Sequence, residues 1–203
     1  QVVVEDLYRP YRPKRRTRAT IAKEKGLEGL ANIIYMQLTN APITEEAKAY
    51  LSEEKEVHTI EEAIQGAKDI LAETISDEAD YRMHIREMTV RDGIITSTAK
   101  DEETQSVYEM YYSFEEKINK IAGHRVLALN RGEKEKILTV KIEAPEEQIL
   151  AYLEKHIIRK ENPHTKDILK DTIADSYSRL IAPAIEREIR SDLTEKAEDG
   201  AIK

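Results

Sequence analysis

Apolar residues recur at intervals of three to four along most of this chain, and that period limits what it can fold into. The clearest run begins after Thr59 and contains Ile60, Ile64, Ala67, Leu71 and Ile75. Glu62 follows Thr59 at the spacing of a helix-capping box. An apolar stripe with this period is typical of an amphipathic helix, which must bury the stripe against other elements. The pattern therefore predicts a multi-helical fold with a shared core.

Similar stripes predict further helices, which cover about residues 17–26, 27–38, 44–51, 76–92, 103–118, 145–157 and 162–193. Thr17 and Thr44 stand where helix N-caps are expected. Pro183 is expected to kink or restart the last helix. The stripe within 103–118 is aromatic, and aromatic rings can stack on unpaired bases. Its helical spacing favours core packing instead.

Two runs of alternating residues suggest β structure. Arg125–Asn130 and Ile137–Glu143 flank the polar run 131–136 and predict a β-hairpin over about 125–143, packed on helices. The short β-prone run Ile94–Thr98 is expected to be a connection. The predicted fold class is mainly α and multi-helical, two-lobed or elongated, with this hairpin as its β element. The expected lobes are about 1–58 and 59–203.

Composition excludes several classes of protein. The 203 residues contain no cysteine, which excludes disulfides, thiolate metal sites and cysteine nucleophiles. No apolar run approaches the roughly 20 residues that span a bilayer, so we expect no membrane partner. The chain starts without Met or a signal peptide, and its last residues interrupt a helical pattern. We therefore expect a fragment of a longer protein.

Motifs for catalysis and cofactor binding are missing from the sequence. It contains no Gly-x-Gly-x-x-Gly, P-loop, Gly-x-Ser-x-Gly or His-Glu-x-x-His. His84 and Glu87 lie three residues apart on a predicted helix and could offer two metal ligands. A polar pair on a helix surface is the better interpretation. We expect no cofactor, no metal site and no enzymatic activity of this chain alone.

A basic segment stands out in an acidic chain. Residues 1–25 carry eight Lys and Arg against three acids, a balance of +5, so the total of −8 leaves −13 for the rest. The cations of the basic segment are Arg9, Arg12, Lys14, Arg15, Arg16 and Arg18. Pro10 and Pro13 favour an extended backbone, which suits contact with a phosphate chain. The alternative is an ordered connector whose arginines pair with acids of the same chain, and the two interpretations are compatible.

Four segments, in order along the chain, resemble one family. Their sequences are EDLYRPYRPKRRTRATIA at 5–22, LAETISD at 71–77, GHRVLALNRGE at 123–133 and APAIEREIR at 182–190. Together they are similar to the bacterial Tex transcription accessory proteins. Gly123 and Ala184 stand where serine is more usual in that family.

The resemblance implies a cytoplasmic, multidomain, nucleic-acid-binding factor linked to transcription. It implies that this chain is the N-terminal and central helical region, without the RNase-H-like, helix-hairpin-helix and C-terminal OB-fold domains. RNA or DNA would then be bound mainly through those absent domains. We expect this region to be architectural and non-catalytic, with secondary phosphate contacts through the basic segment. The alternative is a protein-interaction scaffold for RNA polymerase or another transcription factor.

A second candidate contact lies next to the predicted hairpin. Arg125 follows His124, and Arg131 begins the polar run between the two expected strands. If these side chains face solvent, Arg125 and Arg131 could bind phosphate as the basic segment could.

Overall fold

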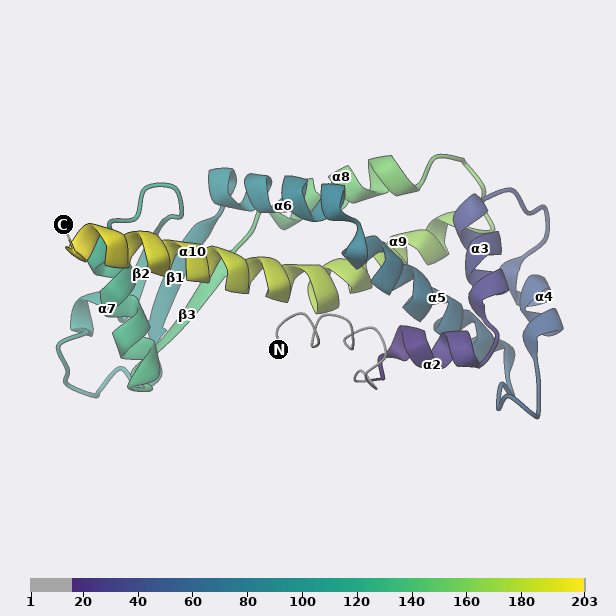
Figure 1. Ribbon diagram of the computed structural model, residues 1–203, viewed down its shortest axis with the longest axis horizontal. Coiled ribbons are helices and arrows are strands. Elements are labelled where there is room, and N and C mark those ends of the chain that lie inside the picture. Colours follow the sequence, from purple (N-terminus) through teal and green to yellow (C-terminus); the bar gives the residue numbers. More distant parts are fainter. Residues whose placement is uncertain (1–15, 203) are drawn as a thin grey trace, which may run out of the picture. The chain divides into compact units, whose positions relative to one another are not determined.

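The computed structural model describes residues 16–202, and its contacts divide the chain into two compact units (Figure 1). Unit 1 combines the chain up to Ile75 with Ile157–Ile173, and unit 2 combines Ser76–His156 with the chain from Ala174 onward. The predicted lobes, 1–58 and 59–203, were each continuous. Each unit instead uses two stretches of chain, and the chain passes between the units within helices.

Unit 1 is helical and follows the capping signals of the sequence. Its elements are α2 (Arg18–Glu24), α3 (Glu28–Met36), α4 (Ile43–Ala47), a 3-10 turn (Lys48–Tyr50), most of α5 (Ile60–Asp77) and most of α9 (Lys166–Asp175). Thr17 caps α2 as predicted, because its hydroxyl accepts the amide of Thr20 at 3.0 Å. Thr44 instead lies inside α4, whose N-cap is Pro42.

The capping box predicted for α5 is present in a shifted form. The amide of Glu62 donates to the hydroxyl of Thr59 at 3.1 Å, and the carboxylate of Glu62 accepts the amide of His58 at 2.8 Å. Behind this cap, α5 packs closely on Leu27, which lies between α2 and α3. A Cβ placed on Gly66 would lie 2.3 Å from a methyl carbon of Leu27, so any larger residue here would force the buried Leu27 side chain to shift.

Gln37 closes the end of α3 in an unusual way. Its φ of 60° is left-handed, which costs a residue other than glycine about 1–2 kcal/mol. Its amide side chain is buried and donates to the carbonyls of Tyr35 at 2.9 Å and Ile157 at 2.8 Å. It also accepts the backbone amides of Arg159 and Lys160 at 3.1 and 3.2 Å. One side chain therefore forms hydrogen bonds with backbone groups at the C-terminal ends of both α3 and α8. These hydrogen bonds offset the backbone strain.

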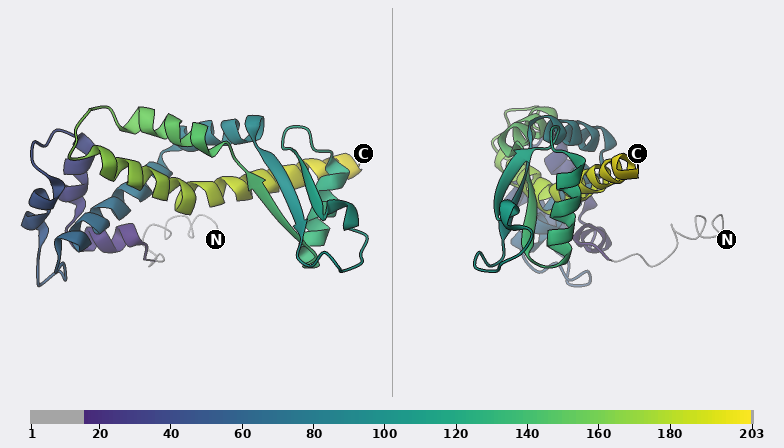
Figure 2. Two further views of the ribbon diagram at one scale, coloured as in Figure 1. Left: turned by 180° about the vertical axis from the view of Figure 1, so that it is seen from behind. Right: turned by 90° about the vertical axis from the view of Figure 1, so that its left-hand side faces the viewer.

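Unit 2 is built on helices and one small sheet. Its elements are α6 (Ala79–Asp92), β1 (Ile94–Ala99), a 3-10 turn (Glu109–Tyr111), β2 (Ser113–Lys117), α7 (Gly123–Lys134), β3 (Leu138–Glu143), α8 (Glu146–Ile157), a π-helical turn (Ser176–Ile181) and α10 (Ala182–Ile202). The strand order is β2-β1-β3, antiparallel throughout, with Ser97 opposite Phe114 and Val140. Helix α7 covers one face of this sheet (Figure 2).

The mainly helical class and the small β element packed on helices are confirmed, but the predicted hairpin is wrong in its first half. Residues 125–130 belong to α7, whose buried residues include Val126 and Leu129. The run contains Leu, Ala and Arg, which are strong helix formers. Its apolar residues match the alternating pattern of a strand, although they also fit a helix. Only the second half, 138–143, is a strand, and its partner is β1.

The other errors concern the partners of that strand. Ile94–Thr98, expected to be a connection, lies in the central strand, because its β-branched residues pair on both sides. The region 103–118, expected to be a helix, holds a 3-10 turn and strand β2. Tyr108 and Tyr111 are buried there as core residues, whereas Val107 is 85% exposed.

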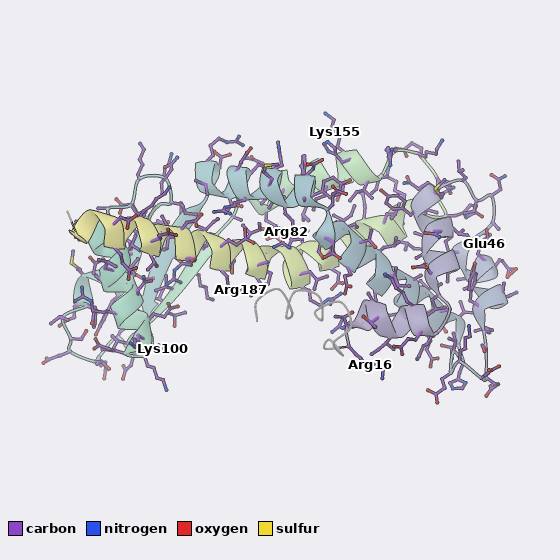
Figure 3. All side chains as sticks on the ribbon, in the orientation of Figure 1. Arg16, Glu46, Arg82, Lys100, Lys155 and Arg187 are labelled. Atoms are coloured by element: carbon purple, nitrogen blue, oxygen red, sulfur yellow. The ribbon has the colours of Figure 1, made fainter. Side chains whose placement is uncertain are left out.

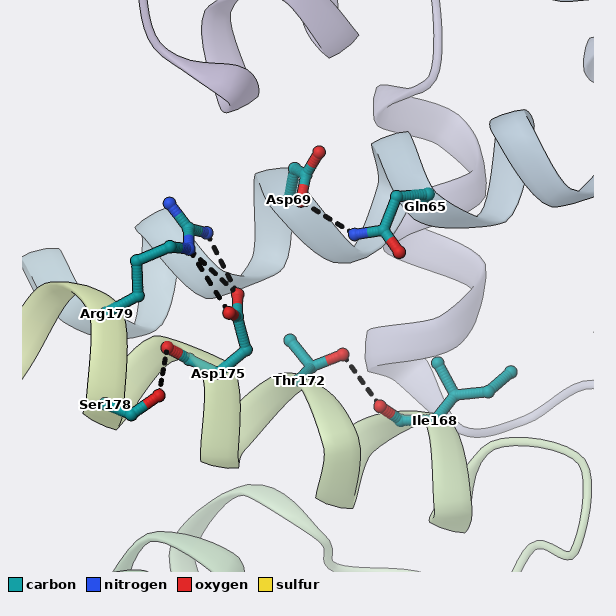
Figure 4. A network of polar contacts seen from close by, with 7 residues as sticks. All are labelled: Gln65, Asp69, Ile168, Thr172, Asp175, Ser178 and Arg179. Atoms are coloured by element: carbon teal, nitrogen blue, oxygen red, sulfur yellow. Dashed lines mark hydrogen bonds and ion pairs between the residues drawn. The ribbon is translucent and has the colours of Figure 1, made fainter.

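The last helix changes its pitch before Pro183, where the sequence predicted a kink or restart. Pro183 has no amide to donate, and the preceding turn is π-helical, with the amide of Ala182 donating to the carbonyl of Tyr177. Asp175 secures this turn, because it accepts Arg179 at 2.9 Å and its carbonyl accepts the hydroxyl of Ser178 (Figure 4). Among the described residues, no helix is long and apolar enough to cross a bilayer.

We expect Gln37→Ala to lower the free energy of unfolding by about 2–4 kcal/mol, because it leaves buried backbone groups unpaired while the left-handed strain remains. Gln37→Gly relieves that strain and should be the milder change by about 1 kcal/mol. Urea denaturation followed by circular dichroism measures both. Equal losses for the two variants would show that the left-handed backbone is not strained.

Candidate nucleic-acid interface

Most of the basic segment lies outside the described residues. Arg9, Arg12, Lys14 and Arg15 lie outside the described residues, and only Arg16 and Arg18 are within them. The guanidinium of Arg16 donates to the carboxylate of Glu24 at 2.5 Å. At this one position the structure supports the connector interpretation, since the arginine pairs with an acid of its own unit.

Arg18 is exposed and borders a hollow of mixed charge. The hollow, about 260 Å³ in volume, is lined by Lys25, Glu62 and Asp69 among others. Its lining contains two acids and two cations, so the hollow is expected to bind phosphate only weakly. Arg16 and Arg18 belong to unit 1, whereas the other described candidates, Arg125 and Arg131, belong to unit 2.

Arg125 and Arg131 share helix α7 but not one face. Six residues on a helix separate them by about 9 Å along the axis and about 120° around it. Arg125 is half-buried, with its guanidinium carbon 5.5 Å from the ring centre of Phe114. Arg131 is exposed in the last turn. Arg125 thus stabilises the packing of α7 on β2, and Arg131 is the one of the two that is free for a ligand.

Arg131 is joined by cations that sequence analysis missed. Lys134 follows at helical spacing, Lys136 lies in the turn after α7, and the amide of Lys100 donates to the carbonyl of Ile137 at 2.9 Å. Figure 3 shows Lys100 at this end of unit 2. We call Lys100, Arg131, Lys134 and Lys136 the cationic end of unit 2. Lys100 is brought there by the pairing of β1 with β3, which sequence analysis did not predict.

The acids nearest to the cationic end are partly engaged elsewhere. The phenol of Tyr108 donates to the carboxylate of Glu135 at 2.5 Å. That hydrogen bond, with burial, raises the pKa of Tyr108, while the charge of Arg131 lowers it. Glu133 pairs with Arg190 on α10. Exposed Asp101 remains next to Lys100 and weakens the local positive potential. The arrangement suits secondary phosphate contact rather than tight binding.

A network of arginines and carboxylates joins α10 to α6. Glu188 accepts Arg82 at 2.9 Å and Arg86 at 3.2 Å, and Arg86 also pairs with Asp192. Figure 3 shows Arg82 between the two helices. The side chains involved are roughly 36–46% exposed, so water screens them only in part.

A second branch of the network joins α10 to α7. Arg190 donates to Glu133 at 2.7 Å and to the side-chain oxygen of Asn130 at 2.8 Å. Asn130 in turn donates to the hydroxyl of Thr194 at 2.8 Å. Gly123 permits the close approach of the two helices, because a Cβ there would lie 3.2 Å from the Cα of Ala197. We call both branches together the α10 network.

The α10 network uses the segments that carry the family resemblance. Residues 123–133 form α7 and residues 182–190 begin α10, so the two segments contact each other through Arg190 and Glu133. Glu133, Glu188 and Arg190 of these segments are thereby engaged inside unit 2. The sequence offered no signal for this pairing, because the partners lie far apart along the chain.

A buried tyrosine and a half-buried glutamate lie on the π-helical turn and α10. Burial raises the pKa of Glu186, and the charge of Lys141 opposes the shift. Burial, with the charges of Glu146 and Glu186, raises the pKa of Tyr177 to about 12. Its phenol therefore stays protonated at neutral pH and cannot act as a base.

His84 stacks on Tyr152, with ring centres 4.3 Å apart. Tyr152 also contacts His156 and Tyr81. No group of three or more residues able to hold a metal ion occurs in the part of the chain that the structure describes.

Comparison with known proteins finds related sequences over the whole described chain. Residues 39–203 match the family described as Tex central region-like. YdcI of Bacillus subtilis is 56% identical over 202 residues, which are 98% of this chain and 28% of YdcI. The transcriptional accessory protein Tex of Neisseria gonorrhoeae is 30% identical over 211 residues, 100% of this chain and 27% of that protein.

A human relative extends the similarity beyond bacteria. The S1 RNA-binding domain-containing protein 1 is 27% identical over 215 residues, 98% of this chain and 21% of that protein. The chain therefore spans between about a fifth and just over a quarter of the length of these three relatives.

We expect Arg190→Met to lower the free energy of unfolding of unit 2 by about 1–2 kcal/mol, because Glu133 and Asn130 lose their shared donor. The matched control is Arg187→Met, an exposed arginine on the same helix labelled in Figure 3. It should change stability by less than about 0.5 kcal/mol. Urea denaturation measures both variants. Equal effects would show that the α10 network does not stabilise unit 2.

The raised pKa of Glu186 predicts a pH-dependent gain for Glu186→Gln. A carboxyl whose folded pKa is raised supplies stability that is present below its unfolded pKa and lost as the pH rises through the folded value. Glutamine cannot ionise and keeps that stability. We expect the urea midpoint of the variant to exceed wild type near pH 7 and to converge with it below about pH 4. A gain of the same size at every pH would contradict this origin.

Proposed function

Because the chain belongs to the Tex family, we propose that it is a non-catalytic, architectural region of a nucleic-acid-binding transcription accessory factor. The names of the relatives support this proposal, since one is a transcriptional accessory protein and another an S1 RNA-binding domain-containing protein. On the same premise we place the protein in the cytoplasm and expect it to act without a cofactor.

The α10 network is the observation that carries the architectural role. Glu133, Glu188 and Arg190 of the family-like segments form ion pairs that join α6, α7 and α10. Catalytic groups need access to a substrate and a tuned pKa, whereas these groups form ion pairs with each other. Their arrangement favours a rigid support over a reaction centre.

Nucleic acid is the proposed partner, RNA or DNA, and two surfaces of this chain could add contacts to it. One is the basic segment from Arg9 to Arg18, and the other is the cationic end of unit 2. Both offer Arg and Lys, which bind phosphate without reading sequence. If four such side chains each neutralise a phosphate, log affinity should fall against log salt with a slope of about −3 to −4.

Fluorescence anisotropy with labelled single-stranded and duplex RNA and DNA tests the two surfaces separately. We expect Arg131→Glu with Lys134→Glu to weaken binding and to make the salt slope shallower by about two. The variant with Arg12, Lys14, Arg15 and Arg16 all changed to Glu should do the same for the basic segment. Lys170→Glu, an exposed cation of α9, is the control. Equal binding by wild type and both variants would reject phosphate contact by this chain.

A second candidate function is a scaffold for RNA polymerase or another transcription factor. The balance of −13 outside the first 25 residues supports it, because such a surface attracts basic partners. Capture of purified polymerase by this chain, with nucleic acid digested away, would favour the scaffold. Capture that disappears after digestion would favour the first function.

A further inference from the structure

Two large apolar side chains stand together on the surface of unit 1. Met36 is 57% exposed and Leu38 is 59% exposed. A single exposed apolar residue is ordinary on a protein surface, but neighbouring ones beside a hollow mark a contact site. The exposure of these two neighbouring side chains therefore indicates a contact site.

The backbone between these two residues fixes how they are presented. Gln37 lies between them with its left-handed φ of 60°, and only 4% of it is exposed. Its buried amide is held by hydrogen bonds to three segments of backbone, including those at Ile157 and Arg159. The amide of Asn162 also donates to the carbonyl of Gln37 at 3.1 Å. Strain held in place in this manner is typical of binding sites.

Two hollows border the exposed pair. One, of about 290 Å³, is lined by Tyr35, Met36, Gln37, Leu38, Arg159 and Lys160. The other, of about 350 Å³, is lined by Asn32, Ile33, Met36, Leu38, Thr39 and Glu46. Met36 and Leu38 form the wall that the two hollows share. We call this surface the Met36–Leu38 groove.

The groove has charge at its two ends and apolar atoms between them. Arg159 and Lys160 are exposed and have no ion pair with any residue in the part of the chain that the structure describes. At the other end, the carboxylate of Glu46 already accepts the hydroxyl of Thr39 at 2.5 Å. Glu46 keeps its negative charge, so the positive charge of the groove is confined to the hollow that Arg159 and Lys160 line, and by these three side chains the groove is net positive although the whole chain is acidic.

We propose that the Met36–Leu38 groove binds an acidic peptide segment of a partner protein. Two apolar side chains of the peptide fill the two hollows that share this wall. Carboxylates next to them pair with Arg159 and Lys160. Methionine adapts its shape to different apolar partners, which suits a surface that recognises short peptides.

The lining favours a peptide over the other occupants. Bases stack on aromatic faces, but the exposed wall here is thioether and aliphatic, with Tyr35 only half exposed. The basic segment of this chain is excluded by its charge, because its arginines would face Arg159 and Lys160. The inference deepens the second candidate function, protein interaction, and rests on it; it is independent of phosphate binding by unit 2.

Selection from a display library of random short peptides tests the proposal on the intact chain. We expect enriched sequences to combine Asp or Glu with two large apolar residues. A synthetic peptide of the enriched sequence should bind about tenfold more weakly or worse to Met36→Asp and Leu38→Asp. It should also bind more weakly to Arg159→Glu with Lys160→Glu, and binding to wild type should weaken as salt is raised.

Matched controls separate the groove from general effects. Met83→Asp changes a methionine of unit 2 that is 58% exposed, and Lys170→Glu reverses an exposed cation of unit 1. Both should bind the peptide as wild type does, with unchanged circular dichroism in every variant. Because Arg131→Glu with Lys134→Glu leaves this surface intact, it should also bind normally even where RNA binding fails.

Several results would overturn the proposal. One is a library that yields no acidic, apolar sequence, and another is an enriched peptide that all variants bind equally. Capture of labelled single-stranded RNA that depends on Met36 and Leu38, without peptide binding, would assign the groove to nucleic acid. Self-association lost in Met36→Asp would assign it to a second copy of this chain.

Discussion

The ion pairs of α10 are the constraint on which unit 2 depends. One helix presents Glu188 and Asp192 to two arginines of α6, and Arg190 to Glu133 and Asn130 of α7. An isolated surface ion pair contributes little to stability. Here several half-buried groups share partners, so each fixes the geometry of the next. The sheet has only three short strands and needs helices held against it to be stable.

The same constraint decides what unit 2 can offer to a ligand. Arg190 holds α7 in place, and the last turn of α7 carries Arg131 and Lys134. These two residues lie at the same end of unit 2 as Lys100, which follows strand β1. Glu133, which would otherwise offset these cations, is engaged by α10. In unit 1, the buried side-chain amide of Gln37 has a similar role. It fixes the ends of helices α3 and α8, and with them the exposed residues on either side of Gln37. In both units a polar contact inside the protein determines a surface feature outside it.

Capping and proline signals in the sequence predicted several helix ends, although Thr44 does not cap α4. Thr17 and the Thr59–Glu62 pair identified helix starts, and Pro183 marked the change of pitch in the last helix. The sheet was less predictable, because a strand is defined by partners distant in the chain: Ile94–Thr98 is a strand through its neighbours on both sides. Arg131 was found from its charge, whereas Lys100 joined it only through strand pairing, and Gln37 carried no sequence signal for its left-handed backbone.

A double-mutant cycle on Arg190 and Glu133 tests the central claim, that the α10 network holds unit 2 together. The free energy of unfolding is measured for wild type, Arg190→Met, Glu133→Gln and the double variant. We predict that the double variant loses less than the sum of the single losses, by about 1 kcal/mol, because the two side chains lose one shared interaction. Losses that add to within about 0.3 kcal/mol would show that the pair is not coupled and would contradict the account.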